Sequence, residues 1–534
     1  MKLKSIAIEN FRGYQDKTTI DFDDLTVLVG KNDIGKSTVL EALDIFFNDG
    51  KGLIKLDKND VNIHGRSNNN NDIIISTTFS DIPNQVVIDE TNVTQLDKEY
   101  LLNENEELEI EKTFKNGAIT ASALKVCINA KHPTNVDCNN LLLKKNADLK
   151  KNVEALGLSC DKTKNAEMRR AIWEYYKDNL QLDNVKIDVS SKDGDIKSVW
   201  TKLQSYLPYY SLFQSDRKNS DGDNEVQDPL KEAVKQIIND ESLKDTLNGV
   251  AEKVREKLQE VSNLTLEKLK EMNPEIANSL HPNVPSTESL KWADVFKGLS
   301  ISGDEDIPIN KRGSGVKRLI LLNFFRAEAE RRKLASNTPN IIYAIEEPET
   351  SQHKEHQKLL ISALKSLSKE RNTQILLTTH SSDVVKSLDF SNLRLLLSSE
   401  QKTVINTVDA NFLPYPSLNE VNYIAFNDAS VEYHNELYGY IQLVAMEEDD
   451  KCSYEKDFDK WLVSKGCCQS KKWIKKEKDG SEKTKDFTPQ TYIRNSIHHP
   501  ENDNNAPYTE DELRNSIIKM TQIIADMNSN INNG

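Results

Sequence analysis

The sequence predicts an α/β fold with a mixed, largely parallel sheet, a helical insertion with a short coiled coil, and a mostly helical C-terminal domain. Three observations support this class. A glycine-rich loop at 30–38 follows a strand pattern and opens a helix pattern. Two apolar segments, at 341–346 and 373–379, read as buried strands separated by an amphipathic helix. After about residue 400, aromatic and charged residues increase and a helical pattern follows at 419–444.

The N-terminal part alternates like strands at 3–11, 19–30 and 72–81, with a helix at 37–47 between the last two. From 91 to 205 the pattern weakens, and a mostly helical insertion is expected. Apolar residues at three- and four-residue steps over 228–272 indicate long amphipathic helices. These helices either pack on the body of the protein or form a short coiled-coil dimer arm.

Further helices are expected at 314–334, 354–369 and 419–444. The predicted organisation has five parts. They are an N-terminal lobe at 1–90, the insertion at 91–205, a region of long helices at 206–275, a C-terminal lobe at 276–400, and a C-terminal effector or partner-binding domain at 401–534.

Composition limits the class of protein. The chain has 534 residues, 29% of them charged, and a formal net charge of −15. Nucleic acid would therefore have to bind a local basic patch, for which Lys471–Lys485 is the candidate. Six cysteines without a CxxC pair indicate reduced thiols in a cytosol. The N-terminus has no signal-peptide core, and no apolar run reaches the ~18 residues of a membrane span. We expect a cytoplasmic protein without a membrane partner.

The loop "GKNDIGKST" fits the phosphate-loop pattern G-x-x-x-x-G-K-[ST]. Its glycines let backbone N–H groups wrap phosphates at a helix N-terminus. The lysine supplies charge to the β and γ phosphates, and the serine hydroxyl can hold Mg²⁺. The candidate ATP-binding residues of this loop are Gly30, Lys31, Asn32, Asp33, Gly35, Lys36, Ser37 and Thr38.

Two later strand ends carry candidate catalytic residues. "IIYAIEEPE" places Glu346 where an acid would hold Mg²⁺, and Glu347 where a carboxylate could orient or deprotonate water. "LLTTHSS" ends at His380, which could contact the γ-phosphate. With Lys36, these residues predict ATP hydrolysis with ATP and Mg²⁺ as cofactors.

Five segments together resemble the ABC-type ATPases related to SMC proteins, and most of all the overcoming-lysogenization-defect (OLD) group and its anti-phage relatives. They are "ENFRG", "GKNDIGKST", "RGSGVKR", "AIEEPETSQH" and "LLTTHSS". The resemblance covers roughly residues 1–90 and 205–400.

The resemblance implies a homodimer, or a higher even oligomer, joined head to head through ATP. In such a dimer, Ser314 and Gly315 would meet the γ-phosphate held by the partner. Arg12 would lie near the nucleotide, and Gln214 would be a metal ligand. One departure is "SQHK", where relatives have Leu-His-Pro; His353 keeps the histidine, but its neighbours differ.

OLD nucleases carry a C-terminal TOPRIM domain, which needs a strand that ends in Glu-Gly. None follows residue 400, and "DFDKW" at 457–461 lies in a helical context. The chain therefore looks more like the PtuA-type ATPase subunit of Septu systems or of retrons that use it. That resemblance implies a separate HNH-type nuclease partner and an ATPase that regulates it. Nucleic acid, as DNA, tRNA or retron RNA–DNA, is a further candidate partner.

Two alternatives remain. "YIRNSIHH" resembles the HEPN ribonuclease motif, with Arg494, Asn495 and His499 as candidate residues. Residues five apart do not share a helix face, so this reading needs a helix end near Pro500. A self-contained effector with C-terminal RNase activity is thus the first alternative. An SMC-like DNA repair ATPase is the second.

Overall fold

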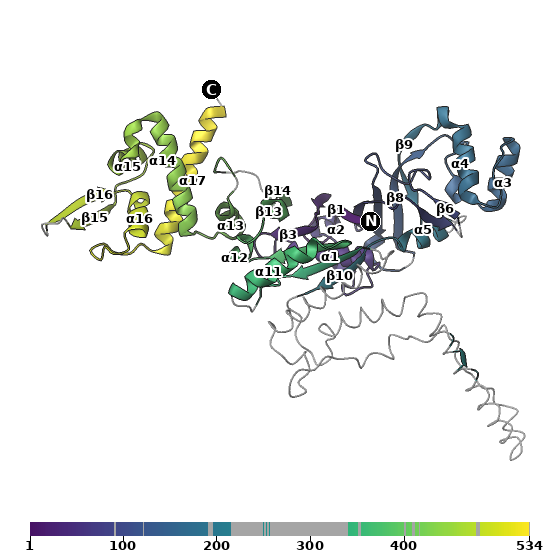
Figure 1. The fold of residues 1–534 in the computed structure, drawn as a ribbon, viewed down its shortest axis with the longest axis horizontal. Helices are drawn as coiled ribbons and strands as arrows, with labels where there is room; N and C mark the ends of the chain where they lie inside the picture. Colours follow the sequence, from purple (N-terminus) through teal and green to yellow (C-terminus); the bar gives the residue numbers. More distant parts are fainter. Residues whose placement is uncertain are drawn as a thin grey trace, which may run out of the picture. The chain divides into compact units, whose positions relative to one another are not determined.

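The structure is a computed structural model that describes residues 1–89, 92–120, 122–190, 196–214, 249, 252–253, 256, 340–350, 354–399, 402–407, 412–415, 417–476 and 481–532. The chain divides into two compact units, 1–215 with 337–534, and 216–336. All helices and strands given below belong to the first unit (Figure 1). Of the helices expected at 228–272, only residues 249, 252–253 and 256 are described, and all four are helical. The helix expected at 314–334 lies outside the described residues, as do Ser314, Gly315 and His353.

The first sheet has the order β10-β11-β12-β3-β13-β14. Its strands are β3 (Leu25–Val29), β10 (Tyr209–Phe213), β11 (Ile341–Glu346), β12 (Thr373–Thr379), β13 (Leu393–Ser399) and β14 (Lys402–Thr407). All neighbours are parallel except β13 and β14. Every residue of β3, β11 and β12 is buried, as expected for parallel strands covered on both faces. The predicted largely parallel sheet is confirmed.

Helices connect and cover these strands. They are α1 (Lys36–Phe47), α11 (Lys354–Ser368) and α12 (Ser382–Val385). α1 contacts β10 and β12, and α11 packs on β12. The apolar residues of α1 lie at three- and four-residue steps, so that Val39, Leu40, Leu43 and Phe46 are buried together.

The second sheet is antiparallel, in the order β2-β1-β4-β7-β8-β9. Its strands are β1 (Lys2–Glu9), β2 (Thr18–Asp21), β4 (Ile73–Ser80), β7 (Leu108–Phe114), β8 (Leu124–Pro133) and β9 (Leu182–Asp188). A small hairpin pairs β5 (Val86–Asp89) with β6 (Asn92–Thr94). The helices of this part are α2 (Ile63–Ser67), α3 (Asn146–Ala155), α4 (Asn165–Tyr175) and α5 (Ile196–Gln204).

The prediction of a mostly helical insertion at 91–205 is wrong for much of its length. Three of its segments, β7, β8 and β9, extend the antiparallel sheet. β7 and β8 bury alternate side chains, so a strand period was present in the sequence. β9 is a largely exposed edge strand in which only Val185 and Ile187 alternate with polar residues, a weak strand pattern.

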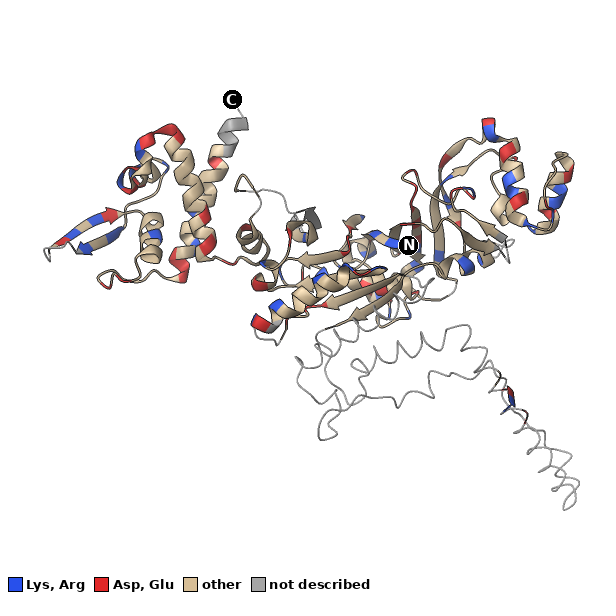
Figure 2. Cartoon of the chain, in the orientation of Figure 1, with Lys and Arg blue, Asp and Glu red and all other residues tan. Residues whose placement is uncertain are grey.

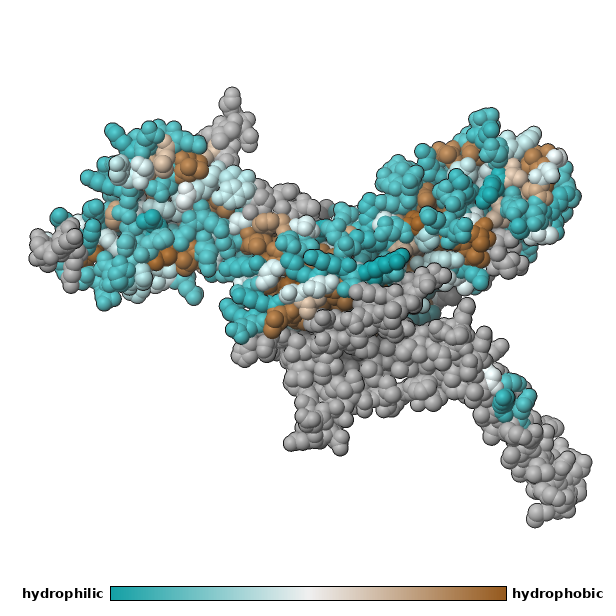
Figure 3. Space-filling model, in the orientation of Figure 1, coloured by the Kyte–Doolittle hydropathy of each residue, from teal (hydrophilic) through white to brown (hydrophobic). Residues whose placement is uncertain are grey.

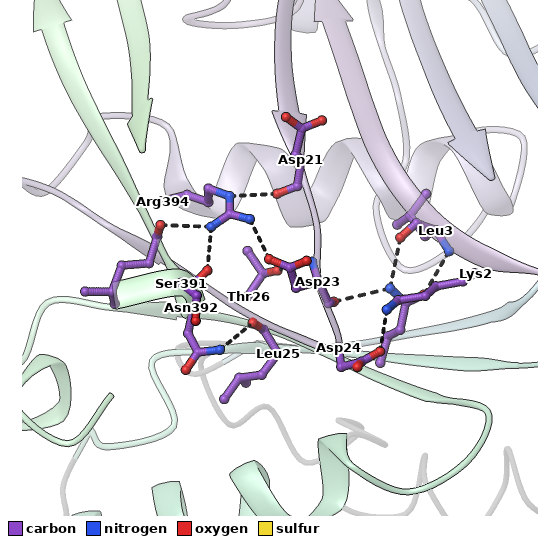
Figure 4. Close-up of polar contacts among 12 residues, drawn as sticks. Lys2, Leu3, Asp21, Asp23, Asp24, Leu25, Thr26, Ser391, Asn392 and Arg394 are labelled. Carbon is purple, nitrogen blue, oxygen red and sulfur yellow. Dashed lines mark hydrogen bonds and ion pairs between the residues drawn. The ribbon is translucent and has the colours of Figure 1, made fainter. Parts of the chain in front are cut away.

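The two sheets meet at a junction built from side-chain hydrogen bonds to backbone groups (Figure 4). The amide of Gln374, on β12, accepts from the Leu3 N–H at 2.8 Å and donates to the Leu3 carbonyl at 2.9 Å. Arg394, on β13, donates to the Asp21 carbonyl and to the Asp23 carboxylate. The turn before β3 is thus fixed to strands that lie about 370 residues later in the chain.

The helix after the phosphate loop is held at its far end by a buried lysine. Lys112, on β7, is 1% exposed and donates to the Phe46 carbonyl at 2.7 Å and to Asp49 Oδ1 at 2.6 Å. Burial lowers the pKa of Lys112, and the neighbouring Asp49 carboxylate opposes that shift. A cation near the helix C-terminus is also favoured by the helix dipole. The contact ties α1 to the antiparallel sheet.

The C-terminal region has its own core, and its mostly helical character is confirmed. Its elements are α13 (Leu418–Phe426), α14 (Val431–Glu448), α15 (Glu455–Ser464), β15 (Lys471–Lys476), β16 (Glu482–Phe487), α16 (Pro489–His498) and α17 (Glu510–Asn532). Tyr433, Leu437, Phe458, Ile517 and Ile524 are among its buried residues. The described part of the chain also contains short 3₁₀ helices. They are η1 (Lys58–Asp60), η2 (Lys115–Gly117), η3 (Leu141–Leu143), η4 (Lys177–Asn179), η8 (Phe390–Asn392) and η9 (Asp450–Ser453).

The surface in view is largely hydrophilic, with scattered apolar side chains (Figure 3). This agrees with a charged fraction of 29%. Among the described helices, none is both long and apolar enough to cross a membrane.

We expect Gln374→Met to lower the free energy of unfolding by about 2–4 kcal/mol, because both backbone groups of Leu3 lose their buried partner. Urea denaturation measures the change. Gln522→Met, an exposed position on α17, is the matched control and should stay near wild type. Equal stability of the two variants would show that water replaces the Gln374 amide.

Burial of His434 makes a pH-dependent prediction for the C-terminal region. Desolvation lowers its pKa from 6.5 to about 4, and its Nε2 lies 2.9 Å from Ser516 Oγ. Below pH 6.5 His434 is protonated in the unfolded state, whereas in the folded state it stays neutral down to about pH 4. Stability therefore falls as the pH falls through this range. Between pH 7 and pH 5 this group should therefore remove about 2 kcal/mol of stability.

Hydrogen exchange of α14 and α17 at the two pH values measures this loss. In His434→Gln, whose amide can still reach Ser516 but does not titrate, the decline should be smaller by that amount. An unchanged pH dependence in this variant would assign the loss to other groups.

Candidate functional site

Three predicted motifs meet at one edge of the first sheet because their strands are neighbours. β12 pairs with β11 on one side and with β3 on the other, all in parallel. The register sets Thr378 beside Glu346 and Thr379 beside Val29. The phosphate loop after β3, the acids after β11 and His380 after β12 therefore leave the sheet side by side.

The phosphate loop needs glycine at two positions. Gly35, the N-cap of α1, has φ +102°, and a Cβ there would lie 3.1 Å from the Tyr14 ring. A Cβ on Gly30 would lie 2.6 Å from the Leu396 carbonyl oxygen. Both positions thus exclude a side chain, and Tyr14 donates from its hydroxyl to the Gly35 carbonyl at 3.1 Å.

Lys36 is buried within this loop, at 5% exposure. Its Nζ donates to the Gly30 carbonyl at 2.8 Å and to the Lys31 carbonyl at 2.9 Å, which leaves one of its three donors for a phosphate. Burial lowers the pKa of Lys36, and the carboxylates of Glu347 and Glu349 oppose the shift. Lys36 is therefore electrostatically coupled to the acids of β11 before any nucleotide binds.

The other loop residues lie outward or at the helix start. Lys31, Asn32 and Asp33 are exposed, and Asp33 has φ +61°. Ser37 and Thr38 are half-buried in the first turn of α1. Exposed residues at the loop tip are accessible to a nucleotide, as the motif requires.

Glu347 lies in a strained turn. It is not glycine, yet its φ is +41°, and Pro348 follows. Its N–H is directed at β12, where the Thr378 carbonyl accepts at 3.1 Å and Thr378 Oγ1 at 3.2 Å. A left-handed backbone at a residue other than glycine costs about 1–3 kcal/mol. The strain aims the Glu347 side chain at the end of the neighbouring strand.

The side chains of Glu347 and His380 are in contact. His380 Nδ1 lies 3.1 Å from Glu347 Oε1, and both side chains are partly exposed. The structure thus joins two residues that the sequence proposed separately, 33 positions apart. A carboxylate paired with an imidazole at a sheet edge can hold a water molecule and accept its proton.

A third acid, Glu349, was not predicted. It is 3% exposed; its Oε1 accepts from the Thr379 hydroxyl at 2.6 Å and from the His380 N–H at 3.3 Å. Its Oε2 is buried and has no hydrogen-bond partner among the described residues. Glu349 therefore fixes the turn that carries His380. The only signal in the sequence is the repeated acid in "EEPE".

The proposed metal ligands converge from β10, β11 and α1. Register pairs Phe213 with Ile345, so Gln214 and Glu346 follow at the same edge. Gln214 Oε1 is buried and lacks a partner among the described residues, which suits an oxygen ligand for a cation. Oxygen donors from Ser37, Glu346 and Gln214 fit Mg²⁺ chemically. Within the described ranges, no group of three or more His, Cys, Asp or Glu could hold a metal ion.

Arg12 and Gln214 meet at Glu41, a residue of α1 that was not predicted. Gln214 Nε2 donates to Glu41 Oε1 at 3.0 Å, and the Arg12 guanidinium pairs with the other carboxylate oxygen. Arg12 also bonds Asp60 Oδ1 at 2.8 Å and stacks its guanidinium on Phe11. Glu41 therefore orients both predicted residues. No sequence signal marks it, because its partners lie 29 and 173 positions away.

Two of the three candidate RNase residues are in contact, since Arg494 Nη1 donates to Asn495 Oδ1 at 3.4 Å. Arg494 lies over the Tyr438 ring, with Glu455 Oε2 at 4.0 Å. Asn495 is buried, whereas His499, just past the end of α16, is exposed and has Glu501 Oε1 at 3.2 Å. The predicted helix end before Pro500 is confirmed. Arg494 and His499 contact different side chains, Tyr438 and Glu455 for the arginine and Glu501 for the histidine, so the RNase role of these residues stays a prediction.

We expect Glu349→Ala to lower kcat for ATP hydrolysis by about ten- to a hundredfold, since charge-assisted hydrogen bonds to buried groups contribute about 1.5–3 kcal/mol. Glu349→Gln keeps an oxygen acceptor for Thr379 and should lose less. Steady-state hydrolysis assays measure both. Glu355→Gln, exposed on α11, is the control. If Glu349→Ala turned over like this control, Glu349 would not position His380.

Residues 1–385 match the family described as AAA ATPase domain. Endonuclease GajA from Bacillus cereus (strain HuB5-5) is 22% identical over 489 residues, which are 78% of this chain and 63% of that protein. The chain thus spans less than two thirds of this relative's length. Chromosome partition protein Smc from Halobacteriovorax marinus is 50% identical over 44 residues, 8% of this chain and 4% of that protein.

Two solved head domains align with most of the chain. The SMC head domain from Thermotoga maritima is 13% identical, with a TM-score of 0.30, over 77% of this chain and all of that one. The Smc head domain derived from Pyrococcus furiosus is 13% identical, with a TM-score of 0.37, over 76% and 96%. These scores are too low to carry an argument. The family match covers more than half of the chain, and the three motifs of an ATPase meet at one sheet edge: the chain belongs to the AAA ATPase domain family.

Proposed function

We propose that this chain binds and hydrolyses ATP between two copies of itself, and that its nucleotide state regulates a nuclease in anti-phage defence. One observation carries the catalytic part. Parallel neighbours β3, β12 and β11 bring Lys36, His380 and Glu347 to the same sheet edge, with Glu347 and His380 in contact.

Each residue has a role that follows from its geometry. The loop amides and the free donor of Lys36 bind the phosphates. Glu347 accepts a proton from the attacking water, and His380 holds the Glu347 carboxylate in place. Ser37, Glu346 and Gln214 would hold Mg²⁺, which when bound neutralises charge on the β and γ phosphates. Arg12, fixed by Asp60 and Glu41, lies beside α1 on the side of Gln214.

The proposal of a dimer rests on the order of the motifs in the sequence. A second glycine-rich loop, with Ser314 and Gly315, lies between the phosphate loop and the acidic strand, as in ABC-type ATPases. In a head-to-head arrangement this loop would close on the nucleotide of the other copy. Bound ATP would then hold the dimer closed, and hydrolysis would open it.

The link to a nuclease rests on two supports. The similarity to Endonuclease GajA places an endonuclease among the relatives of this chain. The resemblance to Septu-type ATPase subunits favours a separate HNH nuclease as the effector. An RNase centred on His499 is the competing proposal, and the exposure of that side chain, 54%, keeps it accessible to RNA.

We expect Glu347→Gln to bind ATP with near wild-type affinity but to hydrolyse it at least about a hundredfold more slowly, the usual loss on removal of a general base. The variant should accumulate as an ATP-bound dimer, which light scattering would detect. Lys36→Ala, which cannot hold phosphates, should remain monomeric with ATP. Wild-type turnover by Glu347→Gln would remove Glu347 from the reaction.

The purified chain, with plasmid DNA or bulk tRNA and with or without ATP–Mg²⁺, separates the two nuclease proposals. With a separate effector, neither substrate is cut. If tRNA is cut and His499→Ala abolishes the cleavage, the chain carries its own RNase, and the proposal of a separate nuclease fails while the ATPase assignment stands.

A further inference from the structure

Glu41 lies on α1, one helical turn after Ser37 of the phosphate loop. Residues four apart share a helix face, with their Cβ atoms about 5–6 Å from each other. Ser37 and Glu41 therefore lie on the same side of α1, and the Glu41 side chain is only 14% exposed. A group that is bound by Glu41 is thus held close to one of the proposed ligands of Mg²⁺.

The amide of Gln214 approaches Glu41 with its nitrogen. Gln214 Nε2 donates to Glu41 Oε1 at 3.0 Å. A carboxylate offers only acceptors, so the amide must turn its NH₂ group toward Glu41 and its oxygen away. This oxygen is buried and has no hydrogen-bond partner among the described residues. Burial of an unpaired acceptor costs about 1–3 kcal/mol, and a bound cation would remove that cost.

The sheet places a further oxygen ligand beside this amide. In the parallel pairing of β10 with β11, Phe213 lies opposite Ile345, so that Gln214 is level with Glu346 at the end of β11. The Gln214 oxygen therefore lies between two elements that carry proposed ligands, α1 with Ser37 and β11 with Glu346.

Arg12 holds Glu41 from the other side. Its guanidinium pairs with Glu41 Oε2 and, through Nε, with Asp60 Oδ1 at 2.8 Å. The backbone of Arg12 is also fixed, since its N–H donates to the Asp60 carbonyl at 2.7 Å and its carbonyl accepts from Asn62 Nδ2 at 2.6 Å. Both oxygens of Glu41 are thus engaged, which gives the carboxylate, and the amide bound to it, one orientation.

We propose that Glu41 is a positioning residue that sets the affinity of the ATP site for Mg²⁺ by aiming the Gln214 oxygen into that site. In this role Glu41 contacts neither the nucleotide nor the metal and acts through Gln214. Removal of a residue that orients a metal ligand typically costs ten- to a hundredfold in metal affinity. The inference rests on the proposed function, because it requires a nucleotide site that takes a divalent cation.

The test measures binding rather than hydrolysis. The full chain binds a fluorescent, slowly hydrolysed ATP analogue, first in EDTA and then at increasing free Mg²⁺. The free Mg²⁺ concentration at half of the rise in analogue affinity reports the affinity for the metal. In Glu41→Ala this concentration should increase about ten- to a hundredfold. Affinity in EDTA should not fall, because the phosphate loop is unchanged.

Two further variants separate positioning from a general effect on the fold. Gln214→Ala should show the same increase, and the double variant with Glu41→Ala should show no further increase, because both changes remove one interaction. Glu41→Gln keeps an oxygen that can accept from Gln214 Nε2, so it should restore most of the metal affinity.

Two controls complete the design. Asp60→Asn weakens the other ion pair of Arg12 but leaves the contact between Glu41 and Gln214, so it should keep the wild-type dependence on Mg²⁺. Glu447→Ala removes an exposed carboxylate at the acidic C-terminal end of α14 (Figure 2) and should behave like the wild type.

An unchanged dependence on Mg²⁺ in Glu41→Ala, or additive losses in the double variant, would overturn the role of Glu41 while the ATPase proposal stands. If the wild-type chain bound no analogue with or without Mg²⁺, the proposed function itself would fail. The two failures are therefore distinguishable in one set of titrations.

Discussion

The buried amide of Gln374 determines where the strands of the site lie. It hydrogen-bonds Leu3 on the antiparallel sheet and the Asp23 carbonyl just before β3, while its own backbone belongs to β12. One side chain therefore fixes β12 relative to β1 of the antiparallel sheet and to the turn before β3. Because β12 ends at Thr379 and His380 follows it, the position of this sheet edge depends on a contact at the opposite end of the same strand.

At that edge, the structure concentrates negative charge around a single buried cation. Glu346 ends β11, Glu347 and Glu349 follow it, and Lys36 interacts with the latter two. Three carboxylates so close together repel one another, and the strained backbone of Glu347 adds to the cost. A cation bound by oxygen ligands would reduce this repulsion. The site is therefore organised for its ligands at the expense of local stability.

Local patterns allowed the ATP-site motifs and the parallel sheet to be predicted, because a phosphate loop needs its glycines and lysine within nine residues. Glu41 and Glu349 could not be found this way, since their roles are defined by partners on other strands. The strands at 108–114 and 124–133 carry apolar residues at alternate positions, but charged residues lie between them and weaken the pattern. The edge strand at 182–188 shows alternation only at Val185 and Ile187, and its pairing with β8 joins segments about 55 residues apart. The roles of Ser314, Gly315 and His353 remain predictions, outside the described residues.

Lys112 connects α1, which packs on the parallel sheet, to β7 of the antiparallel sheet. The helix starts at the phosphate loop and ends at a buried ammonium group that belongs to the other sheet. If α1 moved along its axis, the buried Lys112 Nζ would lose its hydrogen bond to the Phe46 carbonyl, or β7 would have to move with the helix. A displacement of α1 caused by a phosphate bound at its N-terminus would therefore be transmitted to the antiparallel sheet at its C-terminus.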